Sequence, residues 1–142
     1  MPTIVVPAKM ENLGEVKRYL KQAIPNDYAA QTSNVILVAE ELLVNVFSYG
    51  YPEGSEGKAE VSIGTIDDNG EAMLQLMVRD WGAPFNPFEE VREPDLSLDV
   101  ATRPIGGLGV FLIKQVSHKQ FWSFEDGSNR IRILFRSLKE VA

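Results

Sequence analysis

The sequence contains no cysteine. This absence excludes disulfide bonds, thiolate zinc sites, iron–sulfur clusters and cysteine nucleophiles. Histidine is almost absent as well, because His118 is the only one. Metal sites built from several imidazole rings are therefore excluded, and a Ser-His-Asp triad would have to use that one ring. His118 lies near the start of a predicted strand, where we expect it to be structural.

Long apolar runs and an excess of positive charge are also missing. No apolar run approaches the roughly 20 residues of a membrane-spanning helix, and the amino terminus has no signal-peptide pattern. The chain carries 14 Lys and Arg against 20 Asp and Glu, for a net charge of −6. Nucleic-acid binders usually have a basic surface. We therefore expect a cytoplasmic protein without a membrane or nucleic-acid partner, and its 142 residues fit one domain, 1–142.

The spacing of apolar residues predicts a two-layer α/β (α+β) sandwich, a mostly antiparallel sheet with helices on one face. The predicted helices span residues 10–24, 32–48 and 110–117, with Thr32 or Ser33 as the N-cap of the second. The predicted strands span 3–6, 59–66, 73–80, 119–125 and 129–137, with hairpin turns at 67–70 and 126–128. Residues 81–107 are predicted to form a long loop, which suggests a functional lid.

A narrow polar stripe runs along the predicted helix 32–48. At about 100° per residue, Asn34, Glu41, Asn45 and Ser48 fall within roughly a 60° arc in an apolar surround. The functional interpretation is a pocket lining, in which the carboxylate and the amide, one turn apart, hold a cation or orient a water. The alternative is a solvated strip or a simple Glu–Asn hydrogen bond. Glu40 points elsewhere and is expected to be solvated.

Asp80 continues the apolar face of the strand 73–80. A carboxylate that faces a core needs hydrogen-bond donors, either backbone N–H groups or the amino group of a ligand. Gly82 follows at once and allows another group to approach the backbone closely. The alternative is that the strand ends one residue earlier and Asp80 caps a turn.

Three glycines, Gly106, Gly107 and Gly109, directly precede the predicted helix 110–117. Free N–H groups at such a helix start can bind phosphate, although glycines also serve ordinary turns. The segment is not a P-loop, because no Lys-Ser or Lys-Thr pair follows it. It is not a dinucleotide fingerprint either, since no βαβ unit surrounds it.

Taken in order, these segments resemble the motifs of the GHKL (Bergerat-fold) ATPase superfamily. Residues 41–45 (ELLVN) resemble its N box, residues 80–87 (DWGAPFNP) its first glycine box, and residues 106–113 (GGLGVFLI) its second. The short single-domain form and the Gly50-Tyr51 pair are similar to the anti-sigma-factor serine kinases of bacterial partner-switching systems. Two positions depart from the family: Tyr49 stands where a histidine is frequent, and Ile105 where an arginine is common.

The resemblance implies a role for each motif residue. Glu41 would be the general base, Asn45 would coordinate Mg²⁺, and Asp80 would accept the amino group of adenine. Gly82 would let the base lie against the backbone. The phosphates would be wrapped by Gly106, Gly107, Leu108 and Gly109.

The function implied is that of an Mg²⁺- and ATP-dependent serine protein kinase that acts as an anti-sigma factor. Its partners would be a sigma factor and a small antagonist protein that carries the phosphorylated serine, and a homodimer is compatible with this interpretation. Two alternatives stay open. One is a non-catalytic, nucleotide-gated protein-binding module, and the other is the ATP-binding domain of a histidine-kinase-like protein.

Overall fold

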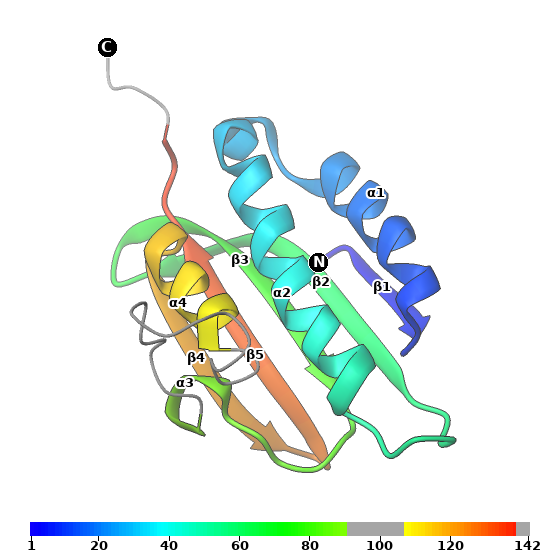
Figure 1. Cartoon of the computed structure of the whole chain (residues 1–142). Helices are drawn as coiled ribbons and strands as arrows, with labels where there is room; N and C mark the ends of the chain where they lie inside the picture. Colours follow the sequence, from blue (N-terminus) through cyan, green and yellow to red (C-terminus); the bar gives the residue numbers. More distant parts are fainter. Residues whose placement is uncertain (91–106, 139–142) are drawn as a thin grey trace.

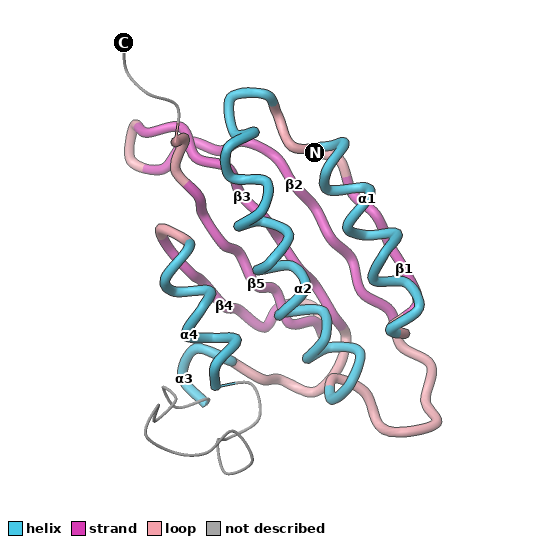
Figure 2. The backbone as a smooth tube through the Cα atoms, turned by 45° about the horizontal axis from the view of Figure 1, so that its top comes forward, coloured by secondary structure: helices cyan, strands magenta, loops and turns pink. Residues whose placement is uncertain are grey.

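Five antiparallel strands form one sheet in the order β1-β2-β3-β5-β4 in the computed structural model, which describes residues 1–90 and 107–138. The strands are β1 (Thr3–Pro7), β2 (Lys58–Asp68), β3 (Glu71–Asp80), β4 (Lys119–Glu125) and β5 (Ser128–Phe135). The helices α1 (Leu13–Ala23), α2 (Thr32–Tyr49) and α4 (Gly107–Val116) cover one face of this sheet (Figures 1 and 2). The predicted two-layer α/β sandwich is therefore confirmed.

The core lies between the sheet and α2, which crosses the middle of the sheet between α1 and α4 (Figure 1). Helix α2 is apolar around most of its circumference because it packs against the sheet below and a helix on either side. Its buried residues include Val35, Val38, Leu42, Leu43 and Val46, and they meet sheet residues such as Val61, Ile63, Leu74, Leu76 and Ile133. Burying each such side chain contributes about 1.5–3 kcal/mol.

Both predicted hairpin turns are confirmed. Asn69 and Gly70 have φ angles of 53° and 89°, and Asp126 and Gly127 have φ angles of 53° and 71°. Two successive positive φ angles match the twist of the flanking strands in a two-residue hairpin. Each turn fixes the register of the hairpin that it closes, β2–β3 or β4–β5. The two hairpins then pair through β3 and β5, which places Asp80 opposite Asn129.

The start of α2 differs from the prediction. Neither Thr32 nor Ser33 caps the helix, because a 3₁₀ turn, Asn26–Gln31, leads directly into it. The N–H of Thr32 already has a partner in the carbonyl of Ala29. The Thr32 hydroxyl donates to that same carbonyl, at 2.8 Å, instead of accepting from the first turn.

Other boundaries shift by a few residues. A 3₁₀ turn, Met10–Asn12, replaces the first residues of the helix predicted over 10–24, α4 begins three residues early, and β5 ends at Phe135. The predicted loop over 81–107 contains a short helix, α3 (Pro87–Glu90), whose first turn is supported by a bond of 3.0 Å from the Phe88 N–H to Asn86 Oδ1. Residues 91–106, the rest of the predicted lid, lie outside the described part of the chain.

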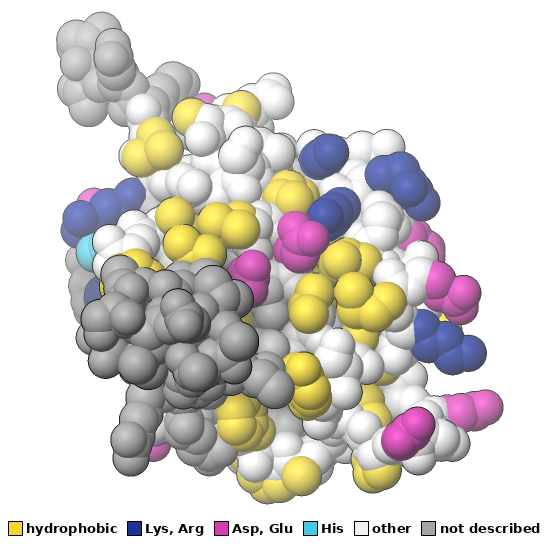
Figure 3. All heavy atoms as spheres, in the orientation of Figure 1, with side chains coloured by type: hydrophobic (Ala, Val, Ile, Leu, Met, Phe, Trp, Pro, Cys, Tyr) yellow, Lys and Arg dark blue, Asp and Glu magenta, His cyan; other side chains and the backbone are white. Residues whose placement is uncertain are grey.

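The surface of the helix-covered side carries small apolar patches among charged side chains (Figure 3). Glu40 of α2 points away from the polar stripe, as predicted, and forms an ion pair of 3.1 Å with Lys17 of α1. Among the described helices, none combines the length and the apolar character needed to cross a bilayer.

Candidate functional site

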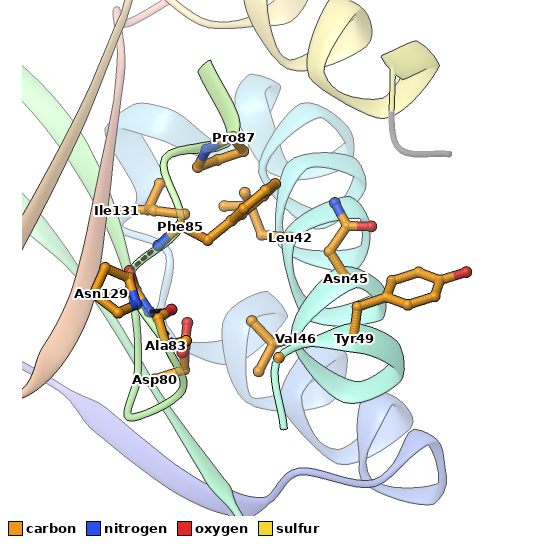
Figure 4. Close-up of a pocket in the computed structure, with 12 residues that line it drawn as sticks. Leu42, Asn45, Val46, Tyr49, Asp80, Ala83, Phe85, Pro87, Asn129 and Ile131 are labelled. Atoms are coloured by element: carbon orange, nitrogen blue, oxygen red, sulfur yellow. Dashed lines mark hydrogen bonds between the residues drawn. The ribbon is translucent and has the colours of Figure 1, made fainter. Parts of the chain in front are cut away.

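A cavity of about 470 Å³ opens between α2 and the segment that follows β3. This volume lies within the usual range for small-molecule sites. Figure 4 shows Asp80, Ala83 and Asn129 on the sheet side of the cavity and Asn45 and Tyr49 on the helix side. The described residues that line it are Leu42, Asn45, Val46, Tyr49, Gly50, Asp80, Ala83, Pro84, Phe85, Pro87, Asn129 and Ile131.

Asp80 is the buried charge of this cavity, with only 7% of its surface exposed. Its Oδ1 accepts hydrogen bonds from the Gly82 N–H at 2.9 Å and from Asn129 Nδ2 at 3.1 Å. Burial raises the pKa of the carboxyl, and these two donors counteract the rise by favouring the ionised form. The second oxygen, Oδ2, forms no hydrogen bond with the described residues, which leaves it as an acceptor for a ligand.

Asn129 is the residue of this site that sequence reasoning missed. It is 3% exposed and forms hydrogen bonds through both ends of its amide. Besides Asp80, its Nδ2 contacts the carbonyl of Ala83 at 2.9 Å and that of Gly82 at 3.4 Å. Its Oδ1 accepts from the Phe85 N–H at 2.9 Å and from Trp122 Nε1 at 3.0 Å. The only signal in the sequence is a polar residue at the start of a strand, which by itself has no functional meaning.

The segment after Asp80 is also held by Tyr51, which follows the end of α2. The hydroxyl of Tyr51 accepts from the Trp81 N–H at 2.8 Å and donates to the carbonyl of Lys58 at 2.5 Å. A Cβ on Gly82 would overlap the carbonyl oxygen of Gly50. Glycine at position 82 therefore lets the end of α2 approach the backbone, a structural reason for this glycine that the motif alone did not reveal.

Asn45 lines the cavity from α2, beside Leu42 and Val46 (Figure 4). Its amide forms no hydrogen bond with another described residue, so its oxygen is open to a ligand. Mg²⁺ in nucleotide sites is usually held by one or two protein oxygens together with phosphates and water. One free amide oxygen fits that pattern. Tyr49, at the position where the resembled family frequently has histidine, also lines the cavity and is 64% exposed.

The polar stripe of α2 does not line one pocket as a unit, which corrects the prediction. Asn34 donates to Gln31 Oε1 at 2.9 Å, and Ser48 lines a second cavity of about 300 Å³. Glu41 is not among the residues lining the main cavity, because the first turn of α4 packs against it. A helical wheel gives the direction of each side chain but not the position of a neighbouring helix.

Glu41 instead faces the start of α4. A Cβ on Gly109 would overlap its Oε2, so glycine at that position leaves room for the carboxylate. Burial raises the pKa of Glu41, and the negative charge of Glu40 raises it further. A carboxylate whose pKa is raised is a better proton acceptor near neutral pH.

The glycine-rich segment is described only in part. Gly107, Leu108 and Gly109 form the first turn of α4, whereas Gly106 lies outside the described residues. The first N–H groups of a helix have no partners within it and attract anions. The first turn of α4 packs against α2 at Glu41, which lies one helical turn from the cavity-lining Asn45.

The sequence model of one family, the histidine kinase-like ATPase domain, matches residues 6–135. The match runs from β1 to the end of β5 and includes Glu41, Asn45, Asp80 and Gly109. No curated protein matches the chain by sequence.

Proposed function

Because the chain belongs to the family of histidine kinase-like ATPase domains, we propose that its cavity binds ATP with Mg²⁺ and that the bound ATP phosphorylates a protein serine. The observation that carries the proposal is that only one of the two carboxylate oxygens of Asp80 accepts hydrogen bonds from the described residues. One oxygen is occupied by two donors, and the other is available on the wall of a largely apolar cavity. A purine with an amino group supplies the donor that this oxygen lacks and an apolar ring for the rest of the cavity.

The apolar walls support the same ligand. Leu42 and Val46 come from α2, Ile131 from β5, and Phe85 extends from the opposite segment toward α2 (Figure 4). Such walls fit the faces of a flat heteroaromatic ring but offer little to a sugar or a peptide backbone. The base would therefore lie between α2 and the segment after β3, with its amino group at Asp80.

The triphosphate would extend from the base toward α4. Asn45 would hold the Mg²⁺, which neutralises phosphate charge and polarises the transferred phosphoryl group when bound. The N–H groups of Gly107, Leu108 and Gly109 would hold the phosphate oxygens.

Glu41 supports phosphoryl transfer to a hydroxyl. Its carboxylate lies at the start of α4, beside the place proposed for the phosphates, and burial raises its pKa. It would accept the proton of an incoming serine hydroxyl as the phosphoryl group is transferred. As the resemblance to GHKL kinases implies, the domain would phosphorylate a serine on a small antagonist protein. It would also bind a sigma factor and so act as an anti-sigma factor.

One observation favours a second candidate function. Glu41 does not line the main cavity, so a nucleotide could bind there without contacting it. In that case the protein would be a non-catalytic binding module whose partner affinity depends on the nucleotide.

Labelled ATP distinguishes these functions. The tagged protein would be purified with its bound partners from its own cells and incubated with γ-³²P-ATP and Mg²⁺. We expect acid-stable label on a serine of a small partner, and no label with Glu41→Ala. Acid-labile label on a histidine would support the histidine-kinase alternative. An intact affinity for ADP without any transferred label would support the binding module.

A further inference from the structure

Asn129 lies at the centre of a hydrogen-bond network that joins three parts of the chain. Its side chain contacts Asp80 at the end of β3, the backbone of residues 82–85, and Trp122 on β4. Buried polar groups need partners, and this amide uses both of its ends. Asn129 therefore has no spare donor or acceptor for direct recognition of a ligand.

The surroundings fix the direction of this amide. The Phe85 N–H and Trp122 Nε1 can only donate, so the atom that faces them must be the oxygen of Asn129. The amino end then has to face Asp80 Oδ1 and the carbonyl of Ala83. Both of these oxygens are acceptors only, the carbonyl always and the carboxylate when Asp80 is ionised. A rotated amide would place donors against donors and acceptors against acceptors.

This arrangement determines which oxygen of Asp80 is left for a ligand. The Gly82 N–H and Asn129 both bind Oδ1, so within the described part of the chain Oδ2 is the open acceptor of the carboxylate. Asn129 also holds Ala83 and Phe85, two residues that line the cavity on the same side. The Asn129 side chain thus orients the carboxylate of Asp80 and fixes the position of the adjacent cavity wall at Ala83 and Phe85.

We propose that Asn129 is the positioning residue for recognition of the base, and that it sets the preference for purines with an amino group through Asp80. The proposal rests on the proposed function, because it takes the cavity to be the base site. Removing the amide would let Asp80 rotate and would release the backbone of residues 82–85. The preference for the amino group would fall more than the affinity for the rest of the nucleotide.

Binding of two nucleotides tests this role. ADP and purine riboside 5′-diphosphate, which is ADP without its amino group, would be titrated calorimetrically into each variant. The ratio of their affinities reports the amino-group contact alone, since a general loss of stability or shape weakens both ligands together. For the wild type we expect ADP to bind about tenfold more tightly, the value of one hydrogen bond to a charged acceptor.

Three variants give the comparison. Asn129→Ser should bring the ratio close to one, because the serine hydroxyl cannot span the network. Asn86→Ser is the matched control. Asn86 lies in the segment after β3 and does not contact Asp80, and a serine there keeps an oxygen for the Phe88 N–H. The affinity ratio of this variant should stay at the wild-type value. Trp122→Phe removes one donor to Asn129 Oδ1 from outside the cavity and should lower the ratio about two- to threefold.

The outcomes separate this proposal from the proposed function. If the wild type binds neither nucleotide, or binds both equally, the proposed base site is wrong and the role of Asn129 is refuted with it. If the wild type prefers ADP but Asn129→Ser and Trp122→Phe keep that preference, the base site stands and the positioning role is refuted. Should Asn129→Ser fail to fold, Trp122→Phe decides, because it keeps an aromatic ring at its position.

Discussion

Gly82→Ala perturbs the contact between the end of α2 and the segment after β3. The φ angle of Gly82 is not in the positive region, so alanine can adopt the same backbone conformation and the cost comes from overlap alone. The new Cβ would overlap the carbonyl oxygen of Gly50, a backbone atom that cannot rotate away. Overpacking of this kind costs about 1–3 kcal/mol, which lowers the melting temperature by about 3–10 °C in a domain of this size.

The same displacement should weaken nucleotide binding. The Gly82 N–H donates to Asp80 Oδ1, so a shift of Gly82 moves the carboxylate that is proposed to read the base. We expect the affinity for ADP to fall about tenfold, the value of one charged hydrogen bond. Urea unfolding followed by circular dichroism would give the stability, and calorimetric titration would give the affinity.

Gly14→Ala is the matched control for this substitution. Gly14 lies in α1, where a Cβ meets only the end of the flexible Arg18 side chain, at 3.4 Å. Because alanine favours helix, this variant should be as stable as the wild type or up to about 1 kcal/mol more stable. Its affinity for ADP should not change. Wild-type stability and affinity in Gly82→Ala would refute the argument that the contact with Gly50 requires glycine.

Three other predictions concern the polar groups of the site. Glu41→Ala should abolish phosphoryl transfer with nearly unchanged ATP affinity, and Asn45→Ala should reduce both; equal loss of ATP binding in the two variants would contradict this division. Gly109→Ala should leave the melting temperature nearly unchanged, because the new Cβ overlaps only the flexible end of the Glu41 side chain. It should slow phosphoryl transfer, since it displaces that carboxylate. Wild-type kinetics in this variant would contradict the contact between Gly109 and Glu41. Because burial raises the pKa of Asp80 above 3.8, the folded state binds more protons than the unfolded state between 3.8 and the raised value. As the pH falls through that interval, the free energy of unfolding of the wild type should therefore rise relative to that of Asp80→Asn. Urea unfolding measures both values, and a difference between them that does not change with pH would contradict the prediction.

Local periodicity was enough to assign three of the site residues to a face of their strand or helix. The alternation of Leu74, Leu76 and Val78 predicted that Asp80 would face the core, and the carboxylate is buried there. The helical wheel predicted that Glu41 and Asn45 share one stripe of α2. It could not show that α4 packs against Glu41 while Asn45 lines the main cavity, because that depends on how two helices distant in sequence pack together.

The contacts that hold Asp80 could not be predicted in this way. Asn129 lies 49 positions further along the chain and becomes a neighbour only through the β3–β5 register. The contact between Gly82 and Gly50 likewise depends on where α2 ends above the sheet. Periodicity gives the face of each strand or helix, whereas these contacts depend on pairing across long separations in sequence.

Asp80 is proposed to accept a hydrogen bond from the amino group of an adenine nucleotide, and calorimetric titration of ADP into Asp80→Asn tests this most directly. In this variant the oxygen of the new amide would stay with its two donors, Gly82 and Asn129, so the NH₂ group of that amide would face the amino group of the base. We expect the affinity for ADP to fall about 5- to 100-fold as a result. Asp67→Asn, which removes the same charge near the end of β2, at the opposite end of the β2–β3 hairpin from Asp80, should bind like the wild type. Undiminished ADP affinity in a folded Asp80→Asn variant would contradict the claim.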